Sequence, residues 1–121
     1  MRFPEPDLAA LAAAEEIDIE TRAADGTAHR TIVWVTVRDG AVYLRSYRGP
    51  TGRWYRETLA DPTVALHVDG RRLAARAEPA TDPASVEACS QGLRDKYKRS
   101  HSLAAMLADA VLPTTLRVVP A

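Results

Sequence analysis

The sequence predicts an α+β fold in which six antiparallel strands curl into a small barrel. A short helix falls between the third and fourth strands, and two helices precede the last strand. One observation is that alternating apolar and polar runs are separated by Asp-Gly pairs at 25–26, 39–40 and 69–70, which favour tight hairpin turns. Another is that six strands are enough to close or half-close a sheet and so hide its edges.

The first part of the chain predicts a helix followed by a strand meander. We expect a helix within residues 1–14, with Asp7 as its N-cap. From Ile17 to Arg22 apolar and charged residues alternate, which predicts a half-buried strand. The run His29–Val37 is largely apolar on both faces, so we expect a single strand in the centre of the sheet. Ala41–Tyr47 completes three consecutive strands joined by hairpin turns.

The second part of the chain adds the remaining strands and helices. A short helical pattern over residues 53–60 ends at Pro62, and strands are expected at Thr63–Val68 and Arg72–Glu78. Asp82-Pro83 is a strong helix start, since proline is favoured at the first helical position. A second helix is expected from about residue 102 to 111, and a last strand at 115–119. We therefore expect a single domain, 1–121, organised as a helix (1–14), a meander (15–78), a helical pair (82–111) and a final strand (113–119).

Composition narrows the classes of function. The 121 residues carry a formal net charge of zero, which argues against a general nucleic-acid or membrane-surface binder. One cysteine, Cys89, rules out an internal disulfide and fits a reducing compartment. The longest apolar run, Leu8 to Ala14, is far too short to cross a bilayer, and the start of the chain does not resemble a signal peptide. We expect a cytoplasmic protein without a membrane partner.

Residues 45–56 form an arginine loop that is the main candidate for a binding site. The loop has no acidic residue before Glu57, so its positive charge is concentrated in a neutral protein. Backbone amides of a turn and a helix start, together with guanidinium groups, suit phosphate or carboxylate. The alternative is a solvated turn whose arginines pair with nearby acids. The residues concerned are Arg45, Arg48, Arg53 and Arg56, with Gly49 and Gly52 between them.

Other notable side chains have two interpretations each. Trp54 and Tyr55 either stack on a ligand ring or pack the short helix into the core, and Tyr55 favours the core. Trp34 is either a sheet-packing residue or a ligand contact. The three histidines lie far apart without metal-ligand spacing, so no metal site is expected. Cys89 lies on an apolar helical stripe and is expected to be a small buried hydrophobe.

The order of elements, with a basic loop after the third strand, resembles the flavin-binding split β-barrels. This superfamily includes the pyridoxamine-phosphate oxidase-like and the deazaflavin-dependent nitroreductase-like proteins. The likeness covers residues 15–78 and is carried by the segments 25–35, Gly52-Arg53-Trp54-Tyr55-Arg56 and Leu59-Ala60-Asp61-Pro62. The chain departs from the pattern at Ile32, where family members often have proline, and in its short first turn. It also resembles an uncharacterised group of small proteins with the same Arg-Gly-Pro loop.

The resemblance implies a homodimer with FMN or a deazaflavin coenzyme at the interface. It further implies hydride transfer to an unknown small acceptor, with the chemistry supplied by the cofactor and no side chain assigned as catalytic acid or base. By the same resemblance, the arginines of the loop bind phosphate, Gly49 and Gly52 allow close approach of the backbone, and Ser46 bonds to the ring. The side chains implied to line the ring are Arg30, Thr31, Trp34 and Trp54.

Two other functions remain open from the sequence. The first is a non-catalytic module of the same fold that binds a flavin-like or other anionic ligand. The second is nucleic-acid binding through the arginine loop, with Trp54 and Tyr47 as stacking platforms. The neutral net charge makes nucleic acid the weaker alternative.

Overall fold

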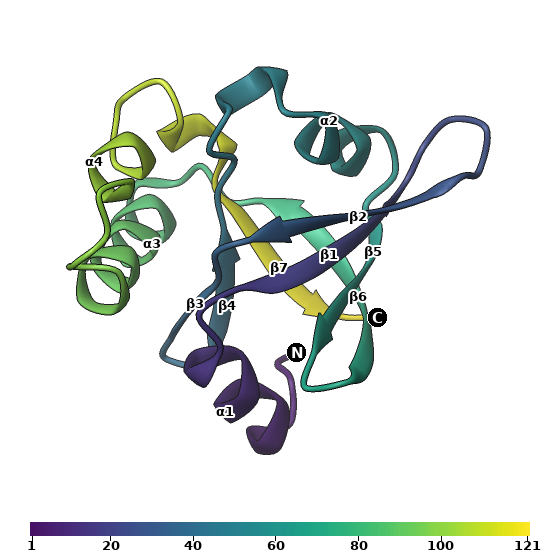
Figure 1. Cartoon of the computed structure of the whole chain (residues 1–121), viewed down its shortest axis with the longest axis horizontal. Helices are drawn as coiled ribbons and strands as arrows, with labels where there is room; N and C mark the ends of the chain where they lie inside the picture. Colours follow the sequence, from purple (N-terminus) through teal and green to yellow (C-terminus); the bar gives the residue numbers. More distant parts are fainter.

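A computed structural model describes all 121 residues, and a single curled antiparallel sheet forms its centre (Figure 1). The order of strands across the sheet is β2-β1-β5-β6-β7-β4-β3. The strands are β1 (Ile17–Arg22), β2 (Ala28–Val33), β3 (Thr36–Arg38), β4 (Ala41–Leu44), β5 (Thr63–Val68), β6 (Arg71–Pro79) and β7 (Leu116–Pro120). The helices are α1 (Glu5–Ala13), α2 (Arg53–Ala60), α3 (Pro83–Lys96) and α4 (Leu103–Met106). The predicted α+β class with a curled antiparallel sheet is confirmed, with seven strands in place of six.

The seventh strand arises because the predicted strand His29–Val37 bends at Trp34 and Val35. Its first half, β2, pairs with β1, and its second half, β3, pairs with β4 at the opposite end of the strand order. The predicted central position is therefore wrong: one continuous segment forms both borders of the sheet. Its apolar residues are not all buried in the sheet. Val33 and Val35 are buried on one face, while Ile32 on the other face is 64% exposed.

Two hairpin turns have the backbone that their Asp-Gly pairs predict. Asp39 and Gly40 have φ values of 51° and 79°, and Asp69 and Gly70 have 51° and 71°. Positive φ at both central residues is the signature of a type I′ turn, whose twist matches that of the flanking strands. These turns set the register of β3 on β4 and of β5 on β6.

The core occupies both faces of the curled sheet. Inside the curl, side chains from the strands meet Leu8 and Leu11 of α1 and Trp54 of α2. A smaller cluster on the outer face joins β4 to the flanking helices: Ala41, Tyr43, Ala80, Cys89, Leu93, Tyr97 and Met106. In Figure 1, α1 and α2 lie at opposite ends of the sheet, while α3 and α4 lie on its left side. β4 is buried on both faces because it has neighbours on each.

The ends of the helices differ in part from the prediction. α3 begins as expected, with the Asp82 carboxylate accepting a hydrogen bond from the Ser85 amide at 3.0 Å. α1 begins at Glu5 with Pro4 at its N-cap, so the expected cap at Asp7 is wrong; proline is tolerated in the first helical turn. Asp7 instead pairs with Arg71.

The second helix of the predicted pair is only one turn long. α4 ends at Met106, and the chain continues through turns and a 3₁₀ turn at Leu112–Thr114. Met106 and Val111 are both buried. A continuous helix would separate two residues five positions apart by about 140°, so irregular backbone is needed to bury both. No helix of the structure combines the length and apolar character that spanning a membrane requires.

Candidate functional site

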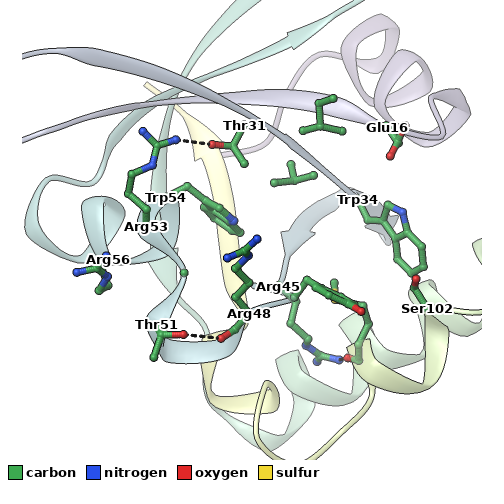
Figure 2. Close-up of a pocket in the computed structure, with 15 residues that line it drawn as sticks. Glu16, Thr31, Trp34, Arg45, Arg48, Thr51, Arg53, Trp54, Arg56 and Ser102 are labelled. Carbon is green, nitrogen blue, oxygen red and sulfur yellow. Dashed lines mark hydrogen bonds between the residues drawn. The ribbon is translucent and has the colours of Figure 1, made fainter.

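A cavity of about 770 Å³ lies between β2, the arginine loop, α2 and α4 (Figure 2). This volume is in the range of small-molecule pockets. Its walls come from four separate parts of the chain. The lining residues are Glu16, Thr31, Ile32, Val33, Trp34, Arg45, Tyr47, Arg48, Thr51, Gly52, Arg53, Trp54, Arg56, Ser102 and Met106.

The arginine loop is a tight turn that ends in a helix start. Gly49 has a φ of 66°, in the left-handed region that favours glycine. The Ser46 hydroxyl donates a hydrogen bond to the Gly49 carbonyl at 2.8 Å. A Cβ on Gly52 would lie 2.6 Å from the Ser46 Oγ, so close packing requires glycine there. The loop therefore delivers the first turn of α2, with Arg53, directly to the cavity wall.

Three arginines of the loop face the cavity without an acidic partner. Arg48, Arg53 and Arg56 are exposed and line the cavity, and none has a carboxylate oxygen within 4.0 Å. Arg53 donates from Nη2 to the Thr31 hydroxyl at 3.2 Å (Figure 2). The alternative of arginines neutralised by nearby acids thus does not describe this loop. Positive charge is concentrated at one end of the cavity.

Glu57, the acid nearest in sequence to Arg53, is bonded elsewhere. Its carboxylate accepts from the Thr21 hydroxyl at 2.6 Å and contacts His29 Nδ1 at 2.9 Å. Burial alone would raise the pKa of this carboxyl. The hydrogen bonds from Thr21 and His29, with the charge of Arg53, outweigh burial and hold the pKa below its usual value. Glu57 therefore ties α2 to β1 and β2.

Arg45 points into the protein toward the helices. Its side chain is 2% exposed, and burial lowers its pKa. Four of its N–H groups have partners at 3.0 to 3.1 Å, and none of them is a carboxylate. The acceptors are the Thr115 and Ser90 hydroxyls and the Met106 and Val86 carbonyls. Arg45 thus joins β4 to α3, α4 and the start of β7.

Aromatic side chains form the other walls of the cavity. The Trp34 indole lies flat on the ring of Tyr97, with centroids 3.9 Å apart and planes 2° apart. Trp54 packs edge-on against Tyr55 at 6.4 Å, and both are buried in the core. Tyr55 is therefore a core residue, as its helical spacing predicts. Trp54 packs in the core and also lines the cavity, so its stacking on a ligand ring stays a prediction.

Most of the residues expected at the site converge on this cavity. Those that do are Thr31, Trp34, Arg45, Arg48, Gly52, Arg53, Trp54 and Arg56. Three do not line it. Arg30 pairs with Asp18 at 3.0 Å, and Ser46 and Gly49 are buried within the turn.

Sequence reasoning missed six lining residues and named a seventh, Tyr47, only as a stacking platform for nucleic acid. The six are Glu16, Ile32, Val33, Thr51, Ser102 and Met106. Tyr47 and Thr51 belong to the arginine loop and were within reach of the sequence. Ser102 and Met106 come from α4 and its start, some fifty residues later in the chain, and only the topology brings them here.

Solved structures with the same fold define the class of protein. An F420 reductase is 24% identical, with 98% of this chain and 96% of that chain covered and a TM-score of 0.67. A candidate pyridoxamine 5′-phosphate oxidase from Listeria innocua is 15% identical (96% and 91% covered, TM-score 0.69). The haem storage protein HutZ from Vibrio cholerae is 14% identical (100% and 92% covered, TM-score 0.67). The chain is a split β-barrel protein, as its resemblance indicated.

A match to a family model also shows the family of this chain. Residues 7–118 match a family described as an uncharacterised protein conserved in bacteria, DUF2255, and the chain belongs to that family. No curated protein sequence is significantly similar to it.

Proposed function

We propose that this protein binds FMN or a deazaflavin coenzyme in the cavity and acts as a small oxidoreductase on an unidentified small acceptor. The observation that carries the proposal is the distribution of groups around the cavity. Three guanidinium groups without acidic partners lie at one part of it, and a half-buried indole lies at another. A ligand with a phosphate and a flat ring has one group for each.

The residues present fit such a coenzyme. Arg48, Arg53 and Arg56 would hold its phosphate, because guanidinium groups pair with phosphate through two parallel hydrogen bonds. Gly52, the N-cap of α2, places the amides of the helix start at the cavity wall, where they would meet the phosphate. Trp34 would stack on the ring, and the Thr31 hydroxyl would hold Arg53 toward the phosphate. When bound, the coenzyme supplies the hydride chemistry, and the protein binds and orients it.

Proteins with the same fold support this proposal, because some of them use a deazaflavin coenzyme. Two structures with the same fold are described as an F420 reductase and an F420-H2-dependent reductase.

We also propose that a second copy of the chain completes the site. Ile32 and Tyr47, at 64% and 58% exposure, are large apolar side chains that line the cavity and remain open to solvent. Burial against a second copy would remove that apolar surface from water.

A second candidate is a binding module of the same fold without turnover. A haem storage protein has this fold, so a split barrel can serve a holding role. The same cavity and the same arginines would hold a flavin-like or other anionic ligand. Nucleic-acid binding through the loop is a third and weaker candidate, which predicts binding to single strands that falls steeply with salt.

A thermal-shift titration with FMN, FAD and the deazaflavin coenzyme tests the proposal. A ligand at one hundred times its dissociation constant stabilises a protein by about 2.7 kcal/mol, which raises the melting temperature measurably. We expect the shift to be lost in the double variant Arg53→Ala/Arg56→Ala. It should persist in Arg76→Ala/Arg99→Ala, which removes two exposed arginines outside the cavity. If none of the three coenzymes shifts the wild-type protein, the proposal is wrong.

Turnover separates the enzyme from the binding module. The bound coenzyme would be reduced chemically and its absorbance followed during addition of quinone, nitroaromatic and enone acceptors. Faster reoxidation than by the same coenzyme free in solution indicates an oxidoreductase. Tight binding with no acceleration across the panel indicates a module that only holds its ligand.

A further inference from the structure

The end of α3 holds the bend that carries Trp34. At the bend, the Val35 amide donates to the Tyr97 hydroxyl at 3.1 Å. The Val35 carbonyl accepts from Lys96 Nζ at 2.7 Å. Both backbone groups of Val35 are thus satisfied by side chains of α3 or its C-cap, where a straight strand would use a neighbouring strand. The backbone next to Trp34 is therefore positioned by residues about 60 positions later in the chain.

The same two side chains hold the segment that leads into β1. The Tyr97 hydroxyl donates its single hydrogen to the Glu15 carbonyl at 2.7 Å, and Lys96 Nζ donates to the Leu11 carbonyl at 3.1 Å. Burial raises the pKa of Tyr97 to about 12, so the hydroxyl keeps the hydrogen that it donates. Glu15 precedes Glu16, another residue of the cavity wall. The segment at Glu16 and the bend at Trp34 are thus both held by Lys96 and Tyr97.

The stacking of Trp34 leaves one side of its indole available. Its contact with Tyr97 is nearly parallel, so one face of the indole is covered. The remainder lines the cavity, as do Glu16 and Ser102 (Figure 2). On Tyr97, the Lys96 ammonium lies 5.4 Å from the ring centroid. Trp34 is therefore a flat wall supported from behind by a ring that is itself bonded to the backbone in two places.

We propose that Lys96 and Tyr97 are positioning residues that hold Trp34 in place as the surface on which the ring of the ligand stacks. This inference rests on the proposed function, and it separates two parts of the site. Affinity for the ring depends on Lys96 and Tyr97, while affinity for the phosphate depends on the arginines. Neither Lys96 nor Tyr97 lines the cavity.

Binding of three probes to matched variants tests this separation. Tyr97→Phe keeps the ring and removes the hydroxyl, and Lys96→Met keeps an apolar stem and removes the ammonium. Matched controls are Tyr43→Phe, in the same core cluster, and Lys98→Met, on an exposed side chain. The probes are riboflavin (a ring without phosphate), FMN, and inorganic pyrophosphate.

We expect Tyr97→Phe and Lys96→Met to weaken riboflavin and FMN about tenfold, the equivalent of roughly 1.4 kcal/mol. Pyrophosphate affinity should change by less than about twofold, within the range of surface substitutions. The controls should bind all three probes as the wild-type protein does. Equal weakening of pyrophosphate and riboflavin would mean that the two residues only stabilise the fold, and it would overturn the inference. So would unchanged riboflavin affinity in both variants.

A measurement without flavin separates failure of this inference from failure of the proposed function. In a Trp54→Phe background, tryptophan fluorescence reports on Trp34 alone, since the chain has two tryptophans. We expect acrylamide to quench Trp34 more strongly when Tyr97→Phe or Lys96→Met is added, at temperatures where all variants are folded. Unchanged quenching would show that the two residues do not position Trp34, whatever the protein binds. Increased quenching without flavin binding would retain the positioning role and reject the coenzyme.

Discussion

Arg45 shows what a charged side chain does when it is buried without a counter-ion. Its hydrogen bonds take the place of a carboxylate. We expect Arg45→Met to lower the free energy of unfolding by about 2 kcal/mol, because the Met106 carbonyl and the Ser90 hydroxyl lose their donor. Urea unfolding measures the change. Arg48→Met, on an exposed side chain, should stay within about 0.5 kcal/mol. Equal stability of both variants would contradict a structural role for Arg45.

Glu20 gives the fold a dependence on acid. Hydrogen bonds from Arg72 and then His67 lower the pKa of its carboxyl from 4.5 to about 2. The folded pKa lies below the unfolded one, so ionised Glu20 stabilises the protein above pH 4.5. That contribution is lost as the pH falls from 4.5 through 2. Melting temperatures measured across this range should fall less steeply in Glu20→Gln than in wild type.

The matched control for acid stability is Glu78→Gln. Glu78 is exposed on β6 and takes no part in the ion pairs of the sheet. Its substitution should leave the slope of melting temperature against pH unchanged. A wild-type slope in Glu20→Gln would show that other carboxyls carry the acid sensitivity.

At the scale of elements, local signals were sufficient where neighbours in sequence decide the structure. The hairpin turns, α2 and the start of α3 follow from Asp-Gly pairs, helical spacing and the Asp82 cap. The bend at Val35 could not be predicted, because its partner Tyr97 is 62 positions away. An apolar pattern on both faces does not distinguish a strand buried in mid-sheet from one that bends between two borders.

The contact between α3 and β3 depends on a glycine. A Cβ on Gly92 would lie 2.1 Å from the hydroxyl of Thr36, which is 2% exposed. We expect Gly92→Ala to destabilise the protein by about 1–3 kcal/mol through overpacking. The sign of this stability change is informative, since alanine in a helix interior is otherwise more stable than glycine by roughly 1 kcal/mol. A loss of stability would therefore point to the clash with Thr36. Chemical denaturation of purified variants provides the measurement.

A double-mutant cycle shows whether the clash is the cause. Thr36→Ala removes the hydroxyl, which is the atom nearest to the added Cβ, and the Thr36 methyl group, so it should restore much of the stability lost in Gly92→Ala. Additive losses from the two substitutions would place the cause elsewhere in α3.

For the whole molecule, the proposed second copy predicts a change of mass on substitution. Light scattering after size exclusion should give twice the mass of one chain for the wild-type protein. Ile32→Asp should give a monomer, because it introduces a charge into the proposed contact. Leu59→Asp is the control, since Leu59 is 52% exposed on α2 and does not line the cavity. A wild-type monomer with coenzyme present would exclude the dimeric site.

The candidate site was predictable to the extent that it is continuous in sequence. The arginine loop could be recognised from the sequence because its arginines and glycines lie within twelve consecutive residues. Arg45 and Arg48 lie in that loop and have opposite environments, which depend on the direction of each side chain in the fold. The wall from α4 and the support of Trp34 by α3 depend on how the barrel closes. No local pattern contains that information.

The bent segment 28–38 also has a mechanical meaning. Since one unbroken piece of backbone forms both borders of the sheet, the curl is held by covalent bonds in addition to strand pairing. This segment connects the two borders, and its bend lies at Trp34 and Val35, beside the cavity. A single cut in the backbone there would leave every strand ladder in place and would remove only the covalent link between the two borders. The shape of the cavity beside the bend thus depends on this stretch of chain as well as on the hydrogen bonds around it.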